Sequence, residues 1–135
     1  MFGKILGFFT LASFAAAIMN YIVKYFLKNY REKIKASEGL NKFFDFCINL
    51  FVKKHKMWGA FAVIGALSHG LLQYSKFGRL NVPGAIAVGL MLIQGILGFS
   101  MTKVDADKRK TLKTFHRIVP VLMLIPIIYH LILVG

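Results

Sequence analysis

The fold follows from two stretches of the sequence, HKMWGAFAVIGALSH at residues 55–69 and HRIVPVLMLIPIIYH at residues 116–130. Each stretch is largely apolar, begins and ends with histidine, and together the two hold all four histidines of the chain. On an α-helix, residues 14 apart lie about 21 Å apart along the axis and within about 40° of the same face. Both stretches are therefore predicted to be apolar helices that carry two histidines on one face.

The composition of the chain is typical of a membrane protein. Of its 135 residues, 57% are hydrophobic, and the mean hydropathy of +0.62 is too high for a soluble domain of this length. A bilayer core needs about 20 mostly apolar residues. Four spans meet this need, at roughly 2–22, 57–74, 82–101 and 118–134. We expect a single all-α domain over residues 1–135, an integral membrane up-and-down four-helix bundle in contact with lipid.

The net charge of +13 is distributed unevenly along the chain. Nine of the 18 Lys and Arg residues lie between the first two spans and six lie between or beside the last two, whereas the middle connection holds only Lys76 and Arg79. This alternation is the positive-inside pattern, and it argues against a nucleic-acid partner. It predicts a multi-pass protein of the cell membrane with both termini outside, basic loops in the cytoplasm, and parallel second and fourth spans.

The first basic loop contains a second amphipathic pattern. Apolar residues recur at helical spacing over roughly residues 40–53, and they are Phe43, Phe44, Cys47, Ile48 and Phe51. This pattern predicts a short interfacial helix at the cytoplasmic surface, or else an extension of the second span. Cys47 is the only cysteine, which excludes an intramolecular disulfide and a cysteine-based metal cluster.

The histidines are the candidate cofactor ligands. Parallel helices with equal spacings bring His55 level with His116 near the cytoplasm, and His69 level with His130 toward the outside. Ionisable residues inside a membrane are usually functional, and histidine is a common axial ligand of haem iron. A zinc site would need three or four converging ligands, whereas each layer offers two histidines. The pattern favours two b-type haems, with these four histidines as the iron ligands.

Other residues on the same two helices suit a haem pocket. Gly59 and Gly65 lie four residues inward from the histidines of the second span, and Pro120 and Pro126 occupy the matching positions of the fourth. Glycine there would leave room for a porphyrin, although both residue types are frequent in membrane helices. Arg117 would neutralise a haem propionate, although a basic residue at that point also follows from the positive-inside rule.

With these residues, the chain resembles the dihaem b-type membrane cytochromes. The resemblance is to the four-helix haem core of the cytochrome b family, in which alternate helices each supply two histidines, and it rests on His55, His69, His116 and His130. The membrane domain of ferric reductases and NADPH oxidases has similar spacings. Unlike full cytochrome b, the chain has no quinol-oxidation motif, and unlike a self-contained flavin reductase it has no nucleotide-binding domain.

The leading hypothesis is transmembrane electron transfer through two bis-histidine haems. These would link a cytoplasmic or quinone partner to a donor or acceptor on the outer face. One alternative is a stand-alone membrane oxidoreductase that acts on quinone, ferric iron or superoxide, with polar contacts from Gln73, Tyr74, Gln94 and Tyr129. Another is a haem-free small transporter or membrane scaffold, which would be colourless. Whether the chain is itself an enzyme, forms a homo-oligomer or serves as a subunit of a larger complex stays open.

Overall fold

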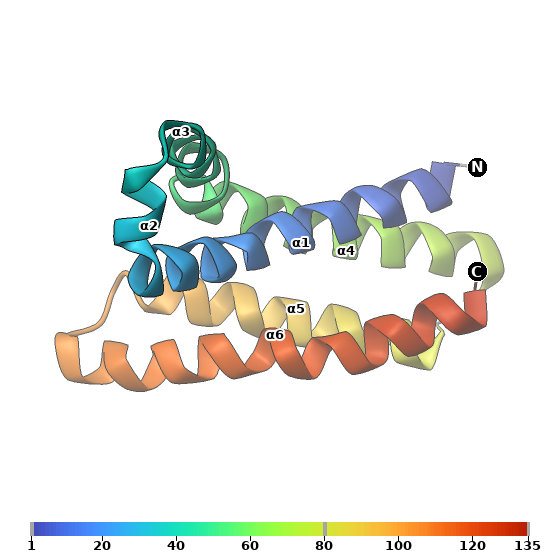
Figure 1. The fold of residues 1–135 in the computed structure, drawn as a ribbon. Helices are drawn as coiled ribbons and strands as arrows, with labels where there is room; N and C mark the ends of the chain where they lie inside the picture. The colour runs from blue at the N-terminus through green and yellow to red at the C-terminus, as the bar shows by residue number, and fades with distance from the viewer. Residues whose placement is uncertain (1, 80, 135) are drawn as a thin grey trace. The chain divides into compact units, whose positions relative to one another are not determined.

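The described part of the chain, residues 2–79 and 81–134 of a computed structural model, consists of helices and their connections (Figure 1). In chain order the helices are α1 (Phe2–Asn29), α2 (Arg31–Ala36), α3 (Glu38–Cys47), the π-helical segment η1 (Ile48–Val52), α4 (His55–Phe77), α5 (Val82–Ser100) and α6 (Ala106–Val134). The all-α class is confirmed for these residues. Six α-helices are described where the prediction had the four of the bundle and one interfacial helix, because the first basic loop folds as α2, α3 and η1.

Three helices among the described residues are long and apolar enough to cross a membrane: α1, α5 and α6. α4, the expected second span, has 23 residues, but none of its stretches is as apolar as the apolar stretches of these three, since His69 and Gln73 lie among its apolar side chains. α6 begins at Ala106, twelve residues before the expected start of the last span, so His116 lies well inside a helix. The membrane character of the chain is thereby supported in outline.

The chain forms two compact units. One contains the start of α1 as far as Phe8 together with the residues from Val63 onward, and the other contains Phe9–Ala62. His69, His116 and His130 belong to the first unit and His55 to the second.

In the first unit, α5 and α6 lie side by side as an antiparallel pair that follows the end of α4 (Figure 1). The turn from α4 to α5 uses Gly78 at φ +66°, a left-handed conformation that glycine adopts without strain. The side chain of Asn81 caps α5 by accepting the backbone N–H of Gly84 at 3.1 Å. A Cβ added to Gly95 would lie 3.2 Å from a methyl group of Val63, so small residues let α4 and α5 pack closely.

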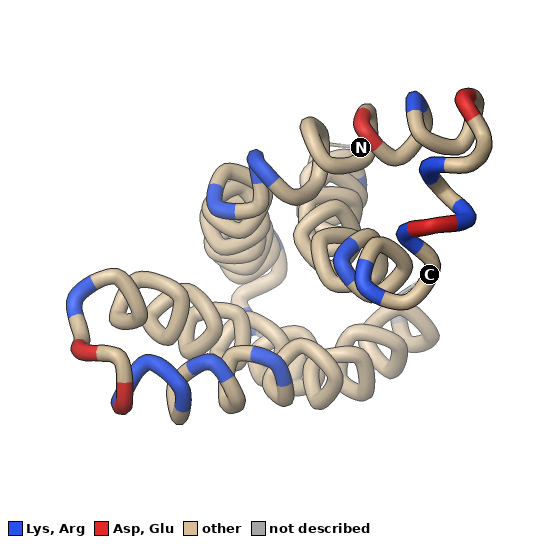
Figure 2. The backbone as a smooth tube through the Cα atoms, turned by 60° about the vertical axis from the view of Figure 1, so that its left-hand side comes forward, with Lys and Arg blue, Asp and Glu red and all other residues tan. Residues whose placement is uncertain are grey.

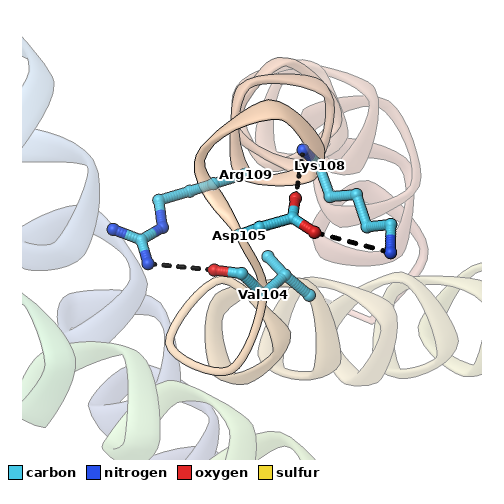
Figure 3. Close-up of polar contacts among 4 residues, drawn as sticks. All are labelled: Val104, Asp105, Lys108 and Arg109. Atoms are coloured by element: carbon cyan, nitrogen blue, oxygen red, sulfur yellow. Dashed lines mark hydrogen bonds and ion pairs between the residues drawn. The ribbon is translucent and has the colours of Figure 1, made fainter.

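The connection from α5 to α6 is fixed by its own polar contacts (Figure 3). Asp105 caps α6, because its Oδ1 accepts the backbone N–H of Lys108 at 3.0 Å while Oδ2 lies 3.6 Å from the Lys108 ammonium. Arg109 donates from Nη2 to the carbonyl oxygen of Val104 at 3.0 Å. These contacts set the start of α6, and hence the register of the two histidines that it carries.

In the second unit, the segment predicted over residues 40–53 folds as α3 followed by η1, and a turn at Lys53 and Lys54 separates it from α4. It is therefore a distinct helix and not an extension of the second span. Phe43 and Phe46 are exposed on α3, whereas Cys47 is buried. Figure 2 shows charged residues concentrated on α2, on α3 and around the α5–α6 connection, while the long helices are mostly free of them.

Candidate functional site

His69 of α4 and His130 of α6 lie close together within the first unit. Their ring centroids are 6.1 Å apart and their planes are nearly perpendicular, at 85°. Both rings are half-buried. Two imidazoles that bind one metal ion from opposite sides, each through a bond of about 2 Å, have ring centres about 6 Å apart. The spacing of this pair therefore suits a shared iron.

Hydrogen bonds orient both rings of this pair. His69 Nδ1 lies 3.0 Å from the carbonyl oxygen of Gly3, and His130 Nδ1 lies 3.0 Å from Oδ1 of Asn81. An oxygen of this kind only accepts, so each ring carries a proton on Nδ1, and the neutral form of each ring has its lone pair on Nε2. Histidines that bind metals usually have this arrangement, in which the second ring nitrogen donates to an oxygen and fixes the tautomer.

Glycines on neighbouring helices lie directly against three histidine rings. A Cβ added to Gly7 would lie 3.1 Å from Cε1 of His69, and one added to Gly84 would lie 2.9 Å from Nδ1 of His130. A Cβ on Gly98 would lie 3.2 Å from Cε1 of His116. A Cβ at Gly84 would therefore force a shift, and one at Gly7 or Gly98 would require the histidine ring to move by a few tenths of an ångström, so glycine at these positions leaves room for the rings.

The other two histidines lie in different units, and their pairing stays a prediction. On α6, His116 packs against α5, where Nε2 of Gln94 donates to the His116 carbonyl oxygen at 2.8 Å. In the second unit, His55 donates from Nδ1 to the carbonyl oxygen of Ala17 at 3.1 Å. Burial lowers the pKa of His55, which stands before the apolar part of α4, and nearby Lys24 lowers it further. His55 is thus kept neutral, the form in which imidazole binds metals.

The face of α1 beside His55 carries buried polar atoms. Ser13 and Asn20 flank Ala17 at helical spacing and are 1% and 7% exposed. The Ser13 hydroxyl oxygen and the Asn20 Oδ1 have no hydrogen-bond partner among the described residues. Because buried polar atoms are normally hydrogen-bonded, this face suits a bound group with polar edges, or water.

A 14-residue register recurs on all four long helices. The carbonyl groups of Gly3 and Ala17 on α1 accept from the histidines of α4, and Gly84 and Gly98 on α5 contact the histidines of α6. These pairs have the same spacing as His55 and His69 and as His116 and His130. The sequence contains this repeat, but the histidines alone do not reveal that α1 and α5 share it.

The residues predicted to make room for a cofactor have varied surroundings. A Cβ added to Gly59 would meet no described atom within 4 Å, so there is open space at that position. Gly65 is buried within α4, and Arg117 is exposed on α6. Close approach to the histidine rings comes instead from Gly7, Gly84 and Gly98, which the sequence indicates only as small residues of the flanking helices and does not place against a histidine.

The number of metal-binding side chains that lie together limits which metal sites the chain can form. In the described part of the chain, no three or more His, Cys, Asp or Glu side chains gather as a metal-binding group. A haem needs only two protein ligands, since the porphyrin supplies the rest.

No family model, curated protein or solved structure matches the chain. Its function is therefore inferred from the histidines and their partners.

Proposed function

We propose that this chain is a b-type cytochrome of the cell membrane that carries electrons across the bilayer through two haems, each held by two histidines. The observation that carries the proposal is the pair His69 and His130. The ring centroids of these two half-buried side chains, which come from different helices, lie 6.1 Å apart, and both rings donate from Nδ1. This combination suits two axial ligands of one iron.

The second haem is proposed between His55 and His116. Three features support it: the equal spacings on α4 and α6, the neutral tautomer of His55 fixed by Ala17, and the contact of Gly98 with His116. In this proposal α1, α4, α5 and α6 form an up-and-down four-helix bundle with both termini outside. His55 and His116 then serve the cytoplasmic side, and His69 and His130 serve the outer side.

The haem iron would supply one-electron chemistry by alternating between its ferric and ferrous states. The protein's own contribution is to hold neutral imidazoles in fixed orientations, so that little rearrangement accompanies the change of charge. In a bilayer, the apolar helices and the lipid around the half-buried rings would keep water away, which would strengthen electrostatic interactions in the site. The proposed electron partners are a quinone or a cytoplasmic redox protein on one side and a donor or acceptor on the outer side.

A stand-alone oxidoreductase is the weaker proposal. Gln94, one of its candidate substrate contacts, donates to the backbone of α6 and so contributes to helix packing. Gln73 lies near the start of α1, where a Cβ added to Gly3 would be 3.2 Å from its amide nitrogen. Both residues thus have structural contacts that account for their presence.

The decisive experiment is a haem count on histidine variants expressed with sufficient haem and purified in detergent. The wild type should show b-type bands after reduction with dithionite and two haems per chain. His69→Ala and His130→Ala should each retain one haem, because each removes one ligand of the same iron. Tyr129→Phe, next to His130, is the matched control and should retain two.

Double variants test the pairing itself. A chain with both His69→Ala and His130→Ala should still hold one haem, whereas His69→Ala with His116→Ala should hold none. A wild type without Soret absorption would overturn the proposal of a cytochrome. Equal haem content in the two double variants would contradict the pairing.

A further inference from the structure

Asn81 has two roles, as the cap of α5 and as a hydrogen-bond partner of His130. It is the residue before α5, and its Oδ1 accepts the backbone N–H of Gly84 at 3.1 Å as the helix cap. The same oxygen lies 3.0 Å from Nδ1 of His130. One side-chain atom therefore fixes the start of α5 and the orientation of a histidine on α6.

The cap determines which ring nitrogen of His130 donates. Because the backbone N–H of Gly84 can only donate, the Asn81 atom that faces it is the carbonyl oxygen and not the amide nitrogen. That oxygen must then accept from His130, which places a proton on Nδ1 and leaves Nε2 with the lone pair in the neutral ring. The absence of a side chain at Gly84 leaves the space that this ring atom occupies, since a Cβ there would lie 2.9 Å from Nδ1.

The two histidines of the pair differ in how they are held. His69 donates to a backbone carbonyl oxygen, which every residue type carries, whereas His130 donates to a side chain that a substitution can change. The partner of the distal ring nitrogen governs how strongly an imidazole donates electrons to a metal, and its loss typically lowers metal affinity by about 10 to 100-fold.

We infer that Asn81 is a positioning residue that sets the ligand strength of His130 and thereby tunes the reduction potential of the haem proposed at His69 and His130. The inference rests on the proposed function. A stronger acceptor at position 81 makes Nε2 a stronger donor, which stabilises ferric over ferrous iron and lowers the potential. Removing the acceptor has the opposite effect and loosens the ring.

Three variants separate the two roles of Asn81. Asn81→Ser keeps a good helix cap, but its side chain is too short to reach His130 as well. Asn81→Asp keeps the cap and offers a charged acceptor, whose hydrogen bonds are roughly twice as strong as neutral ones. Val82→Asp is the matched control, because it adds the same charge one residue away on a side chain that is 68% exposed.

Redox titration of the purified protein should resolve the two haems. We expect Asn81→Asp to shift the ferric-to-ferrous equilibrium of one haem at least tenfold toward ferric, about 59 mV for a one-electron couple. Val82→Asp should shift it clearly less. Asn81→Ser should raise that potential, alter the low-spin ferric signature in electron paramagnetic resonance, and lose that haem more readily.

Two results would overturn the inference while the proposed function stands. One is a two-haem Asn81→Ser protein whose potentials and resonance signature match the wild type. The other is an equal shift in Asn81→Asp and Val82→Asp, which would show that charge alone acts. A wild type that binds no haem would instead overturn the proposed function and this inference together.

Discussion

The glycines against the histidine rings are the residues whose role the structure clarifies most. At Gly84 a Cβ would be 2.9 Å from Nδ1 of His130, and this ring is already held by Asn81. We expect Gly84→Ala to displace His130, at a cost of about 1 to 3 kcal/mol for overpacking, and to reduce the haem content from two toward one. Haem quantification and thermal unfolding in detergent would measure both effects.

Gly89→Ala is the control for this prediction. It lies in the same helix, but a Cβ there would meet no described atom within 4 Å, so the change should leave the haem content at two. Gly98→Ala should impair the other haem, since its Cβ would meet His116. If Gly84→Ala and Gly89→Ala behave alike, close contact with His130 is not what the glycine provides.

The histidines could be recognised from the sequence because their spacing is a property of single helices. Spacing also suggests Gly59 and Gly65, which share a helix with His55 and His69. It does not identify Gly7, Gly84 or Asn81, because their contacts with histidine depend on which neighbouring helix packs there and at what level. Periodicity within a helix indicates a face, whereas the neighbour of that face is set by tertiary packing.

At the scale of elements, the π-helical segment η1 precedes the first histidine of α4. Its i to i+5 bond joins the N–H of Lys53 to the carbonyl oxygen of Ile48 at 2.9 Å. The indole N–H of Trp58, one turn into α4, donates to the carbonyl oxygen of Leu50 at 2.8 Å. This bond joins η1 to α4 across the turn and holds the segment that leads into His55. π-Helical turns often accompany functional sites.

We expect Trp58→Phe to loosen the His55 end of α4. Loss of the indole donor should cost about 0.5 to 1.5 kcal/mol, so retention of the haem proposed at His55 should fall by up to about tenfold. The haem at His69 and His130 should be unaffected. Phe61→Leu, which removes the edge-on ring contact of Phe61 with Trp58 but keeps the hydrogen bond, is the control. Loss of the other haem instead would contradict the role given to Trp58.

The existence of the helical segments can be predicted well from the sequence. Their first and last residues are predicted less well. The apolar runs indicate α1, α5 and α6, but α6 begins at Ala106 and not near residue 118, because Asp105 provides a cap that apolarity does not register. In α4, polar residues instead weaken the apolar pattern by which a membrane span is recognised. His69, which makes it a candidate ligand helix, and Gln73 interrupt its apolar run, so α4 lacks a stretch as apolar as those of the other three long helices.

At the scale of the whole molecule, the charge distribution predicts the orientation in the membrane. Alkaline phosphatase is active only outside the cytoplasm, so fusions after Gly78 or at the C-terminus should be active. Fusions at Ala36 or Asp105, in the basic loops, should be inactive. β-Galactosidase fusions at the same four points should give the reciprocal pattern. Activity of alkaline phosphatase at Ala36 would contradict the proposed topology and exchange the sides served by the two haems.

The acceptors on α1 also affect how this protein can evolve. Ala17 and Gly3 serve His55 and His69 through peptide oxygens, so substitutions on α1 that preserve its helix leave those two hydrogen bonds available. Asn81 alone among these acceptors is a side chain, and a single codon change there alters the bond to His130. Substitution can therefore change the hydrogen bond of His130 directly, by replacing the side chain that accepts it. The hydrogen bonds of His55 and His69 are made to backbone oxygens, which a substitution does not remove.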